Sequence, residues 1–159
     1  MTAEPLDLDD VDRRILGVLT RSGRISWREL GEAVGLSANA TADRVRRLER
    51  SGVIVGYRAE VDLDLVGRPI EAAVEVRRRD DVPAPELEAA FRSRPEVLDA
   101  VHLTGGWDYL LRVRVADPAG LDRVVTELKA ALGATHTETR VVLRRVDGFP
   151  REPLPDDPG

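Results

Sequence analysis

Cysteine is absent from this 159-residue sequence, and histidine occurs only twice. Without cysteine the chain forms no disulfide and offers no thiolate to a zinc ion or an iron–sulfur cluster. Two histidines are few for a metal cage. The composition therefore predicts no metal site and no cofactor, and a reducing, cytoplasmic setting fits it best.

Long apolar runs are also absent. No stretch approaches the roughly 20 apolar residues that a membrane span requires. The first twelve residues hold five acids and no base, whereas a secretory signal is basic and has an apolar core. We expect neither a membrane segment nor an export signal. The 42% of hydrophobic residues predicts a folded chain of one ordinary domain or two small ones.

The net charge of −5 argues against a nucleic-acid partner only until it is divided along the chain. Residues 13–58 hold ten arginines against four acids, whereas the segments on either side are acidic. A basic segment within an acidic chain is typical of a nucleic-acid-binding module joined to another domain. A solvated basic face on an ordinary domain is the alternative.

The apolar spacing between Asp9 and Gly52 is helical three times over, with a break after each run. The first run ends before Ser22-Gly23. The second run opens with the capping-box pattern Ser26-Trp27-Arg28-Glu29, and the third begins after Ser37. Two short helices joined by a glycine-containing turn, with a longer one in front, predict a tri-helical helix-turn-helix. An inert three-helix bundle has the same spacing.

The third predicted helix carries polar side chains opposite its apolar stripe, which suits a helix that lies in the major groove of duplex DNA. We expect Asn39 to pair with adenine and Ser37 to help hold a phosphate at the helix start. Arg44 flanks the buried stripe and is either a phosphate contact or an intradomain ion pair. The predicted DNA-binding residues are Ser37, Asn39, Asp43, Arg44, Arg46, Arg47 and Arg50.

From Val53 onward the apolar pattern has period two or consists of short runs. It predicts strands over 53–57, 70–76, 97–103, 107–115 and 136–146, and helices over 85–94 and 118–133. From residue 67 the order is strand, helix, strand, strand, helix, strand, which is typical of a ferredoxin-like domain.

The chain is thus expected to be α+β, with a tri-helical, winged helix-turn-helix domain joined by a strand hinge to a ferredoxin-like βαββαβ regulatory domain. The expected parts are an acidic tail (1–7), the DNA-binding domain (8–52), the hinge (53–66), the ligand-binding and oligomerisation domain (67–147) and a disordered tail (148–159).

A ferredoxin-like sheet has helices on one face only, so its other face needs a cover, and a second copy of the domain is the commonest one. Alternation does not tell which residues face the second copy and which lie beneath the helices. The candidates for the paired sheets are Val74, Val76, Leu111, Val113, Val141 and Leu143.

Several short motifs in the sequence are shared with a known family. In the first half they are Leu8-Asp9, Asp12, Ile15-Leu16, Gly23-Arg24-Ile25-Ser26, Glu29-Leu30, Val34-Gly35-Leu36-Ser37, Arg44-Val45, Arg47-Leu48-Glu49 and Ser51-Gly52-Val53-Ile54. In the second half they are Thr104-Gly105-Gly106-Trp107-Asp108-Tyr109-Leu110-Leu111, Thr137, Thr139 and Val141-Val142-Leu143. With these motifs the chain resembles, from residue 8 to 147, the Lrp/AsnC (leucine-responsive, feast/famine) family of bacterial transcription regulators.

The resemblance implies a regulator that binds double-stranded DNA as a homodimer, in some members an octamer, and senses an amino acid or a related small metabolite. Two residues depart from the family pattern. Asp43 places an acid on the expected reading face, and Gly106 lacks the polar side chain common in that loop. The first departure bears on the operator sequence and the second on the effector.

The loop between the two middle strands of the second half is the expected effector site. Asp108 can accept an ammonium group, the amides of Gly105 and Gly106 can face a carboxylate, and Trp107 can give apolar cover. A plain hairpin turn explains the same glycines. The predicted effector residues are Leu103, Thr104, Gly105, Gly106, Trp107, Asp108, Tyr109, Thr137 and Thr139.

No catalytic constellation is present in the sequence, so we do not expect an enzyme. Haem-pathway decarboxylases resemble this architecture, and His102 and His136 are the residues that such an enzyme would use. The segment Gly56-Tyr57-Arg58-Ala59 lacks the histidine expected after the hinge of such an enzyme. A sensor that no longer binds DNA is the third alternative, which the arginines of the third helix disfavour.

Overall fold

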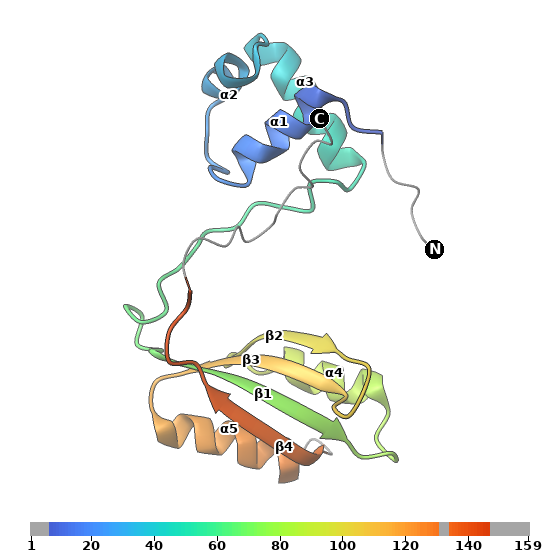
Figure 1. Cartoon of the computed structure of the whole chain (residues 1–159), viewed down its shortest axis with the longest axis vertical. Coiled ribbons are helices and arrows are strands. Elements are labelled where there is room, and N and C mark those ends of the chain that lie inside the picture. Colours follow the sequence, from blue (N-terminus) through green and yellow to red (C-terminus); the bar gives the residue numbers. More distant parts are fainter. Residues whose placement is uncertain (1–6, 131–133, 147–159) are drawn as a thin grey trace. The chain divides into compact units, whose positions relative to one another are not determined.

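The computed structural model describes residues 7–130 and 134–146, and the chain divides into two compact units between Glu60 and Val61 (Figure 1). Each unit has a hydrophobic core of its own. The first unit is helical, and the second combines a sheet with two helices.

The helical unit consists of α1 (Asp10–Leu19), α2 (Trp27–Val34) and α3 (Ala38–Arg50). Each helix begins where a side chain accepts a hydrogen bond from the first turn. Asp9 accepts from the Asp12 amide at 2.8 Å, Ser26 forms the expected capping box with Glu29, and Ser37 accepts from the Ala40 amide at 3.2 Å. The three helices are those that the sequence predicts.

The core of this unit is formed by one apolar side of each helix. Gly35 ends α2 with a left-handed φ of 77°, a conformation that glycine adopts without steric cost. The turn then leads directly into α3, so that α2 and α3 are in close contact. The buried side chains are Ile15, Leu16, Leu30, Val34, Val45 and Leu48.

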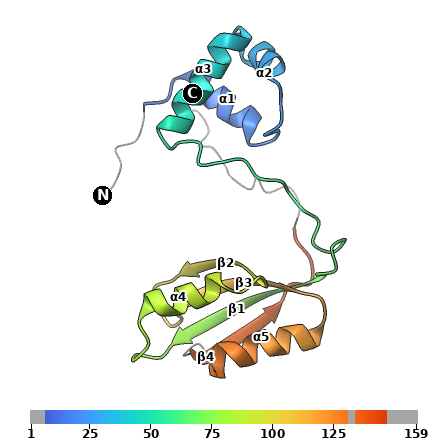
Figure 2. The same ribbon diagram turned by 180° about the vertical axis from the view of Figure 1, so that it is seen from behind.

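The second unit is a four-stranded sheet with two helices, and both helices cover the same face of the sheet (Figures 1 and 2). Its strand order is β2-β3-β1-β4, and all neighbouring strands are antiparallel. This is the ferredoxin-like arrangement that the sequence predicts. The elements are β1 (Ile70–Arg78), α4 (Ala84–Arg92), β2 (Val97–His102), β3 (Tyr109–Val115), α5 (Pro118–Ala130) and β4 (Ala134–Val141).

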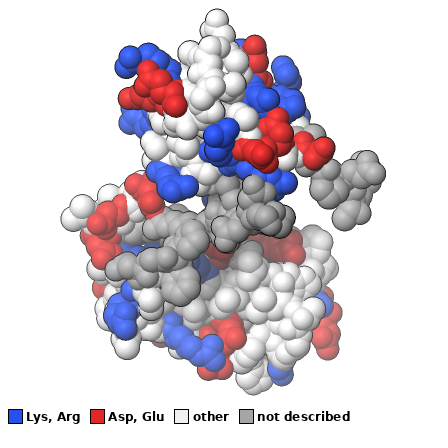
Figure 3. Space-filling view, turned by 45° about the horizontal axis from the view of Figure 1, so that its top comes forward, with Lys and Arg blue, Asp and Glu red and all other residues white. Residues whose placement is uncertain are grey.

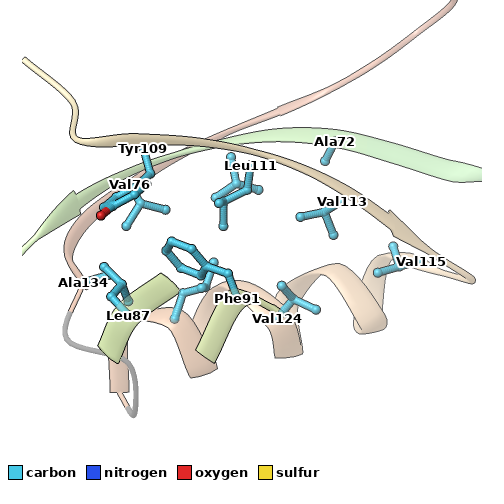
Figure 4. Packing of buried hydrophobic residues seen from close by; sticks show 12 residues of the cluster. Ala72, Val76, Leu87, Phe91, Tyr109, Leu111, Val113, Val115, Val124 and Ala134 are labelled. Carbon is cyan, nitrogen blue, oxygen red and sulfur yellow. The ribbon is translucent and has the colours of Figure 1, made fainter. Parts of the chain in front are cut away.

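The core of the second unit lies between the sheet and the two helices (Figure 4). Phe91 of α4 packs edge-to-face on Tyr109, with ring centroids 5.3 Å apart. Four of the residues considered for the paired sheets lie in this core, because they occupy the sheet face beneath the helices: Val74, Val76, Leu111 and Val113. Of the other two, Val141 is 52% exposed at the end of β4, and Leu143 follows that strand and is 95% exposed.

The sheet face without helices is more polar than the sequence analysis assumed. The register places alternate residues of the strands there, with charged side chains on every strand. Glu75 of β1 binds Arg140 of β4 at 2.5 Å, and Glu71 binds Arg114 of β3 at 2.9 Å. Leu110 and Val101 are paired neighbours on the same face and are only partly covered.

Two predicted strands differ from the structure. Residues 53–57 form no strand, because no other strand among the described residues runs beside them, and the segment from Ser51 to Pro69 is a connection without the expected hinge strand or wing. The last strand ends at Val141 instead of Val146, and residues 142–146 have no regular structure. The expected end of the last helix at Gly133 and the tail 148–159 lie outside the described residues.

We predict that Gly31→Ala destabilises the helical unit. A methyl group on Gly31 lies 2.6 Å from the Leu36 carbonyl oxygen and 3.1 Å from the Thr41 hydroxyl, so α2 and α3 must move apart. The expected cost is about 1–3 kcal/mol in the free energy of unfolding. Chemical denaturation of the two proteins measures it.

The matched control is Glu32→Ala on the next position of α2. Glu32 is exposed, and its ion pair with Arg28 is 3.9 Å long. We expect a change within about 0.5 kcal/mol. A Gly31→Ala protein as stable as this control contradicts the predicted close contact.

Candidate nucleic-acid interface and ligand cavity

The exposed side of α3 carries a line of polar residues at helical spacing. Asn39, Asp43, Arg46 and Arg50 follow one another at intervals of four, three and four, and all are exposed. Asp43 and Arg46 form an ion pair of 2.9 Å between side chains that are 76% and 58% exposed. Such a pair contributes little and is easily exchanged for another partner. We call these four residues the α3 line.

Arg50 differs from the other arginines of this helix. It has no hydrogen bond or ion pair among the described residues, and it lies in the last turn of α3. Its guanidinium is therefore available to an outside acceptor. Arg46 becomes available when its exposed contact to Asp43 opens.

The first turn of α3 is an anion site in principle, because the first amides of a helix have no partner inside it. Ser37 is the N-cap, and its hydroxyl oxygen accepts from the Ala40 amide. The Thr41 hydroxyl donates to the Ser37 carbonyl at 2.9 Å and ties the turn to the helix. The side chain of Ser37 therefore sets where α3 begins.

Arg44 and Arg47 are turned toward α1. Arg44 Nη1 donates to Asp9 at 2.6 Å and to Asp12 at 2.9 Å, so the ion-pair alternative for Arg44 is the one that the structure contains. Arg47 Nη2 donates to the second oxygen of Asp12. The sequence predicts Arg47 among the DNA-binding residues, but in the structure its guanidinium is held by an acid on another helix.

These contacts change the acid–base properties of the groups involved. The pKa of Asp9 is lowered first by the hydrogen bond from the Asp12 amide and then by the bond from Arg44. The two carboxylates raise the pKa of Arg44.

The surface of the helical unit carries both signs of charge, and basic and acidic side chains lie side by side on it in Figure 3.

A cavity of about 510 Å³ lies at one end of the second unit. Its walls come from the end of β1, the turn toward α4, the loop between β2 and β3, and the start of β4. Acids and bases occur in equal number among its charged residues, which suits a small ligand that carries both charges. The lining residues are Arg77, Arg78, Arg79, Asp80, Asp81, Gly105, Gly106, Asp108 and Thr135.

Asp108 anchors this loop to the sheet. Its Oδ2 accepts a hydrogen bond from the Arg78 amide at 2.7 Å, and its own amide donates to the Val76 carbonyl. The other carboxylate oxygen has no hydrogen bond among the described residues. Asp108 therefore has a structural role and also one oxygen that can accept from a ligand.

Only part of the predicted effector set lines this cavity. Gly105, Gly106 and Asp108 do. The Tyr109 ring lies in the core, where burial and a bond to Glu88 raise its pKa. The register places Thr137 and Thr139 opposite Val76 and Val74 on the face beneath the helices. The cavity lining also excludes Leu103, Thr104 and Trp107.

Sequence reasoning missed three arginines, two aspartates and one threonine of the cavity. Arg77 donates to the Gly106 carbonyl at 2.9 Å, and its guanidinium lies 5.5 Å from the centroid of the Trp107 ring. The other missed residues of the wall are Arg78, Arg79, Asp80, Asp81 and Thr135. The signal for them is a run of three arginines directly after an apolar strand, where the chain leaves the sheet.

The two histidines do not form a common site. His102 stacks on Tyr109, with centroids 4.7 Å apart, and His136 is the register partner of Arg77. The register places these positions on opposite faces of the sheet. Within residues 7–130 and 134–146 no group of three or more His, Cys, Asp or Glu side chains is placed to hold a metal ion. No helix there is long and apolar enough to cross a membrane.

Comparison with known families gives two matches that together span most of the chain. Residues 8–49 match the AsnC-type helix-turn-helix domain, and residues 71–151 match the Lrp/AsnC ligand binding domain. The leucine-responsive regulatory protein of Haemophilus influenzae is 40% identical over 143 residues, which cover 87% of this chain and 86% of that protein. The transcriptional regulator AldR of Mycolicibacterium smegmatis is 35% identical over 89% of this chain and 85% of its own length.

Solved structures agree with these matches. A transcriptional regulator of Neisseria meningitidis, determined as a complex with L-methionine, has a TM-score of 0.88 and 31% identity over 94% of this chain and 98% of its own. The feast or famine regulatory protein of Mycobacterium tuberculosis, also complexed with L-methionine, has a TM-score of 0.85 and 30% identity over 94% and 100%.

Proposed function

Because the chain belongs to the Lrp/AsnC family of transcriptional regulators, we propose that it binds operator DNA through α3 as a dimer or higher oligomer, and that an amino acid or related small metabolite adjusts this binding. The observation that carries the proposal is the exposed α3 line within an AsnC-type helix-turn-helix. A regulator of this kind acts where the chromosome is, so we propose the cytoplasm as its compartment. We assign it no enzymatic role.

The α3 line divides between the two kinds of DNA contact. Asn39 near the helix start is suited to adenine, whose N6 and N7 match an amide. Arg46 and Arg50 extend toward guanine edges or phosphates, and Asp43 restrains Arg46 until DNA displaces it. Ser37 and the first amides of α3 take a phosphate.

We predict tight, salt-sensitive binding to duplex DNA. If the two available arginines of each protomer neutralise about four phosphates per dimer, the plot of log affinity against log salt has a slope near −4. Arg46→Ala and Arg50→Ala each remove a cation of the α3 line, so each should weaken binding and make the slope less steep. Fluorescence anisotropy with labelled duplex over a range of NaCl concentrations measures both quantities.

Arg144→Ala is the matched control, since Arg144 is exposed, has no partner among the described residues and lies outside the helical unit. It should leave the slope unchanged. A slope near zero for the unaltered protein, or full binding by both α3 variants, contradicts the proposed interface.

The effector proposal places a free amino acid in the cavity beside Gly105, Gly106 and Asp108. The free oxygen of Asp108 accepts from the ammonium group, and the glycine amides with neighbouring arginines donate to the carboxylate. The two methionine complexes among the structural relatives support an amino acid as the class of ligand. Trp107 and Arg77 form the adjoining wall.

We predict that Asp108→Asn weakens effector binding and leaves the fold intact. The amide oxygen of asparagine can still accept from the Arg78 amide, whereas the negative charge that binds ammonium is gone. Loss of a charged hydrogen bond is worth about 10- to 100-fold in affinity. A thermal-shift panel of the amino acids selects the ligand, and calorimetry then compares the variants.

Asp122→Asn on the exposed side of α5 is the control for the charge change. If Asp108→Asn and the unaltered protein bind the amino acid with equal affinity, the assignment of the Asp108 carboxylate to the ammonium group is wrong. If no amino acid in the panel binds, the loop is a plain hairpin turn.

The second unit is the proposed site of assembly. Its helix-free sheet face combines the partly covered Leu110 and Val101 with paired charges, and a second copy can cover it. The sheet of a lone protomer leaves this face in water. The proposal therefore differs from the sequence expectation in the residues that meet, because four of the six candidates lie in the core.

We predict that light scattering of the full chain gives a dimer or a multiple of it. Leu110→Asp adds an acid between Glu75 and its neighbours on the helix-free face, so it should shift the protein toward monomers at micromolar concentration. Thr126→Asp adds the same acid on the exposed side of α5 and should not shift the protein toward monomers. A monomeric unaltered protein, or equal assembly of the two variants, contradicts the proposed face.

A further inference from the structure

Asp12 is an unusual residue for the inside of a helical unit. Its side chain is 0% exposed, yet it is an acid, and its two oxygens bind two different arginines of α3. An ionised carboxylate withdrawn from water is costly unless it is paired and hydrogen-bonded. Asp12 therefore retains both arginines more firmly than an exposed acid does.

The arginines that it holds are Arg44 and Arg47. Arg44 has a second acid, Asp9, at 2.6 Å, so three carboxylate contacts fix the pair against the start of α1. Arg47 is 49% exposed and has its guanidinium bound inward. If Arg47 moved to a phosphate, Asp12 would lose one of its two partners while it stays buried.

This arrangement divides the cations of α3 into two classes. Arg46 and Arg50 are available to DNA, whereas Arg44 and Arg47 are neutralised from within the unit. Binding to arbitrary sequence depends on the number of phosphates that cations neutralise, and base reading does not. Each arginine that is withheld therefore lowers the sequence-independent affinity, whereas the α3 line, which includes Asn39, can still read bases.

We propose that Asp12 is a specificity-determining positioning residue, which withholds Arg44 and Arg47 from DNA phosphates and so suppresses binding to arbitrary sequence. The inference rests on the proposed binding of DNA through α3 and concerns a residue that does not touch DNA. It also accounts for an acid among the buried residues of α1, beside Ile15 and Leu16.

The test uses the full chain and a 40-base-pair duplex of arbitrary sequence, with affinity measured over a range of NaCl concentrations. Asp12→Asn keeps the shape of the side chain and removes its charge, so Arg44 and Arg47 become free to neutralise phosphates. Affinity should rise about tenfold at low salt, and the log–log slope should become more negative by about 1 for each released arginine.

Asp10→Asn is the matched control. Asp10 lies two residues earlier on α1, is exposed and has no partner among the described residues, so the variant changes the net charge equally and releases no arginine. Its slope should equal that of the unaltered protein. If Asp12→Asn melts at a lower temperature and leaves slope and affinity unchanged, its role is merely structural and the proposal is overturned.

A second pair of variants decides the question if Asp12→Asn does not fold. Arg50→Gln and Arg47→Gln each remove one cation from the same helix. The first should make the slope less negative by about 1 per protomer, and the second should leave it unchanged. Equal losses overturn the role of Asp12 alone, whereas an unaltered protein that binds no duplex overturns the proposed function as well.

Discussion

The buried apolar side chains of each unit come from one side of its helices and, in the second unit, from one face of its sheet, and each unit buries them within its own core. In the helical unit the buried sides of the three helices meet around Leu30 and Val45, which leaves the opposite side of α3 in water. In the second unit one sheet face meets α4 and α5, which leaves the other face free. The polar line on α3 and the free sheet face are therefore products of the same constraint. Both candidate surfaces exist because the cores are one-sided.

The arginines of α3 differ in what they can do because their acidic partners differ in burial. Arg46 faces an exposed aspartate, and water can replace either partner at little cost. Arg44 and Arg47 face Asp12, which water does not reach, so the same kind of ion pair is far harder to open. Net charge along the sequence therefore overstates the positive field of this helix. The reading face depends on which arginines are free.

The sequence predicts the helices well because capping residues and apolar spacing are local signals. It does not predict which sheet face is covered, since alternation is symmetric and both faces can be buried. The register resolves this, because it places Glu71 and Glu75 on one face together with Arg112 and Arg114. A strand at 53–57 fails for a related reason, since extended sequence forms a strand only beside a partner. The contact of Asp12 with Arg47 joins positions 35 residues apart, yet its signal was present, because Asp12 lies at helical spacing from Ile15 and Leu16.

The small number of free cations on α3 has a consequence for regulation. Two available arginines per protomer give one unit only a few contacts, so specific affinity must come from two or more units that bind one DNA molecule. In the proposed function, assembly through the second unit then controls DNA affinity even if the effector never changes α3 itself. An effector that favours one assembly state shifts DNA binding by its differential affinity for the two states. If the proposed effector site beside Asp108 and the proposed assembly hold, reciprocity requires operator DNA to change effector affinity by the same factor.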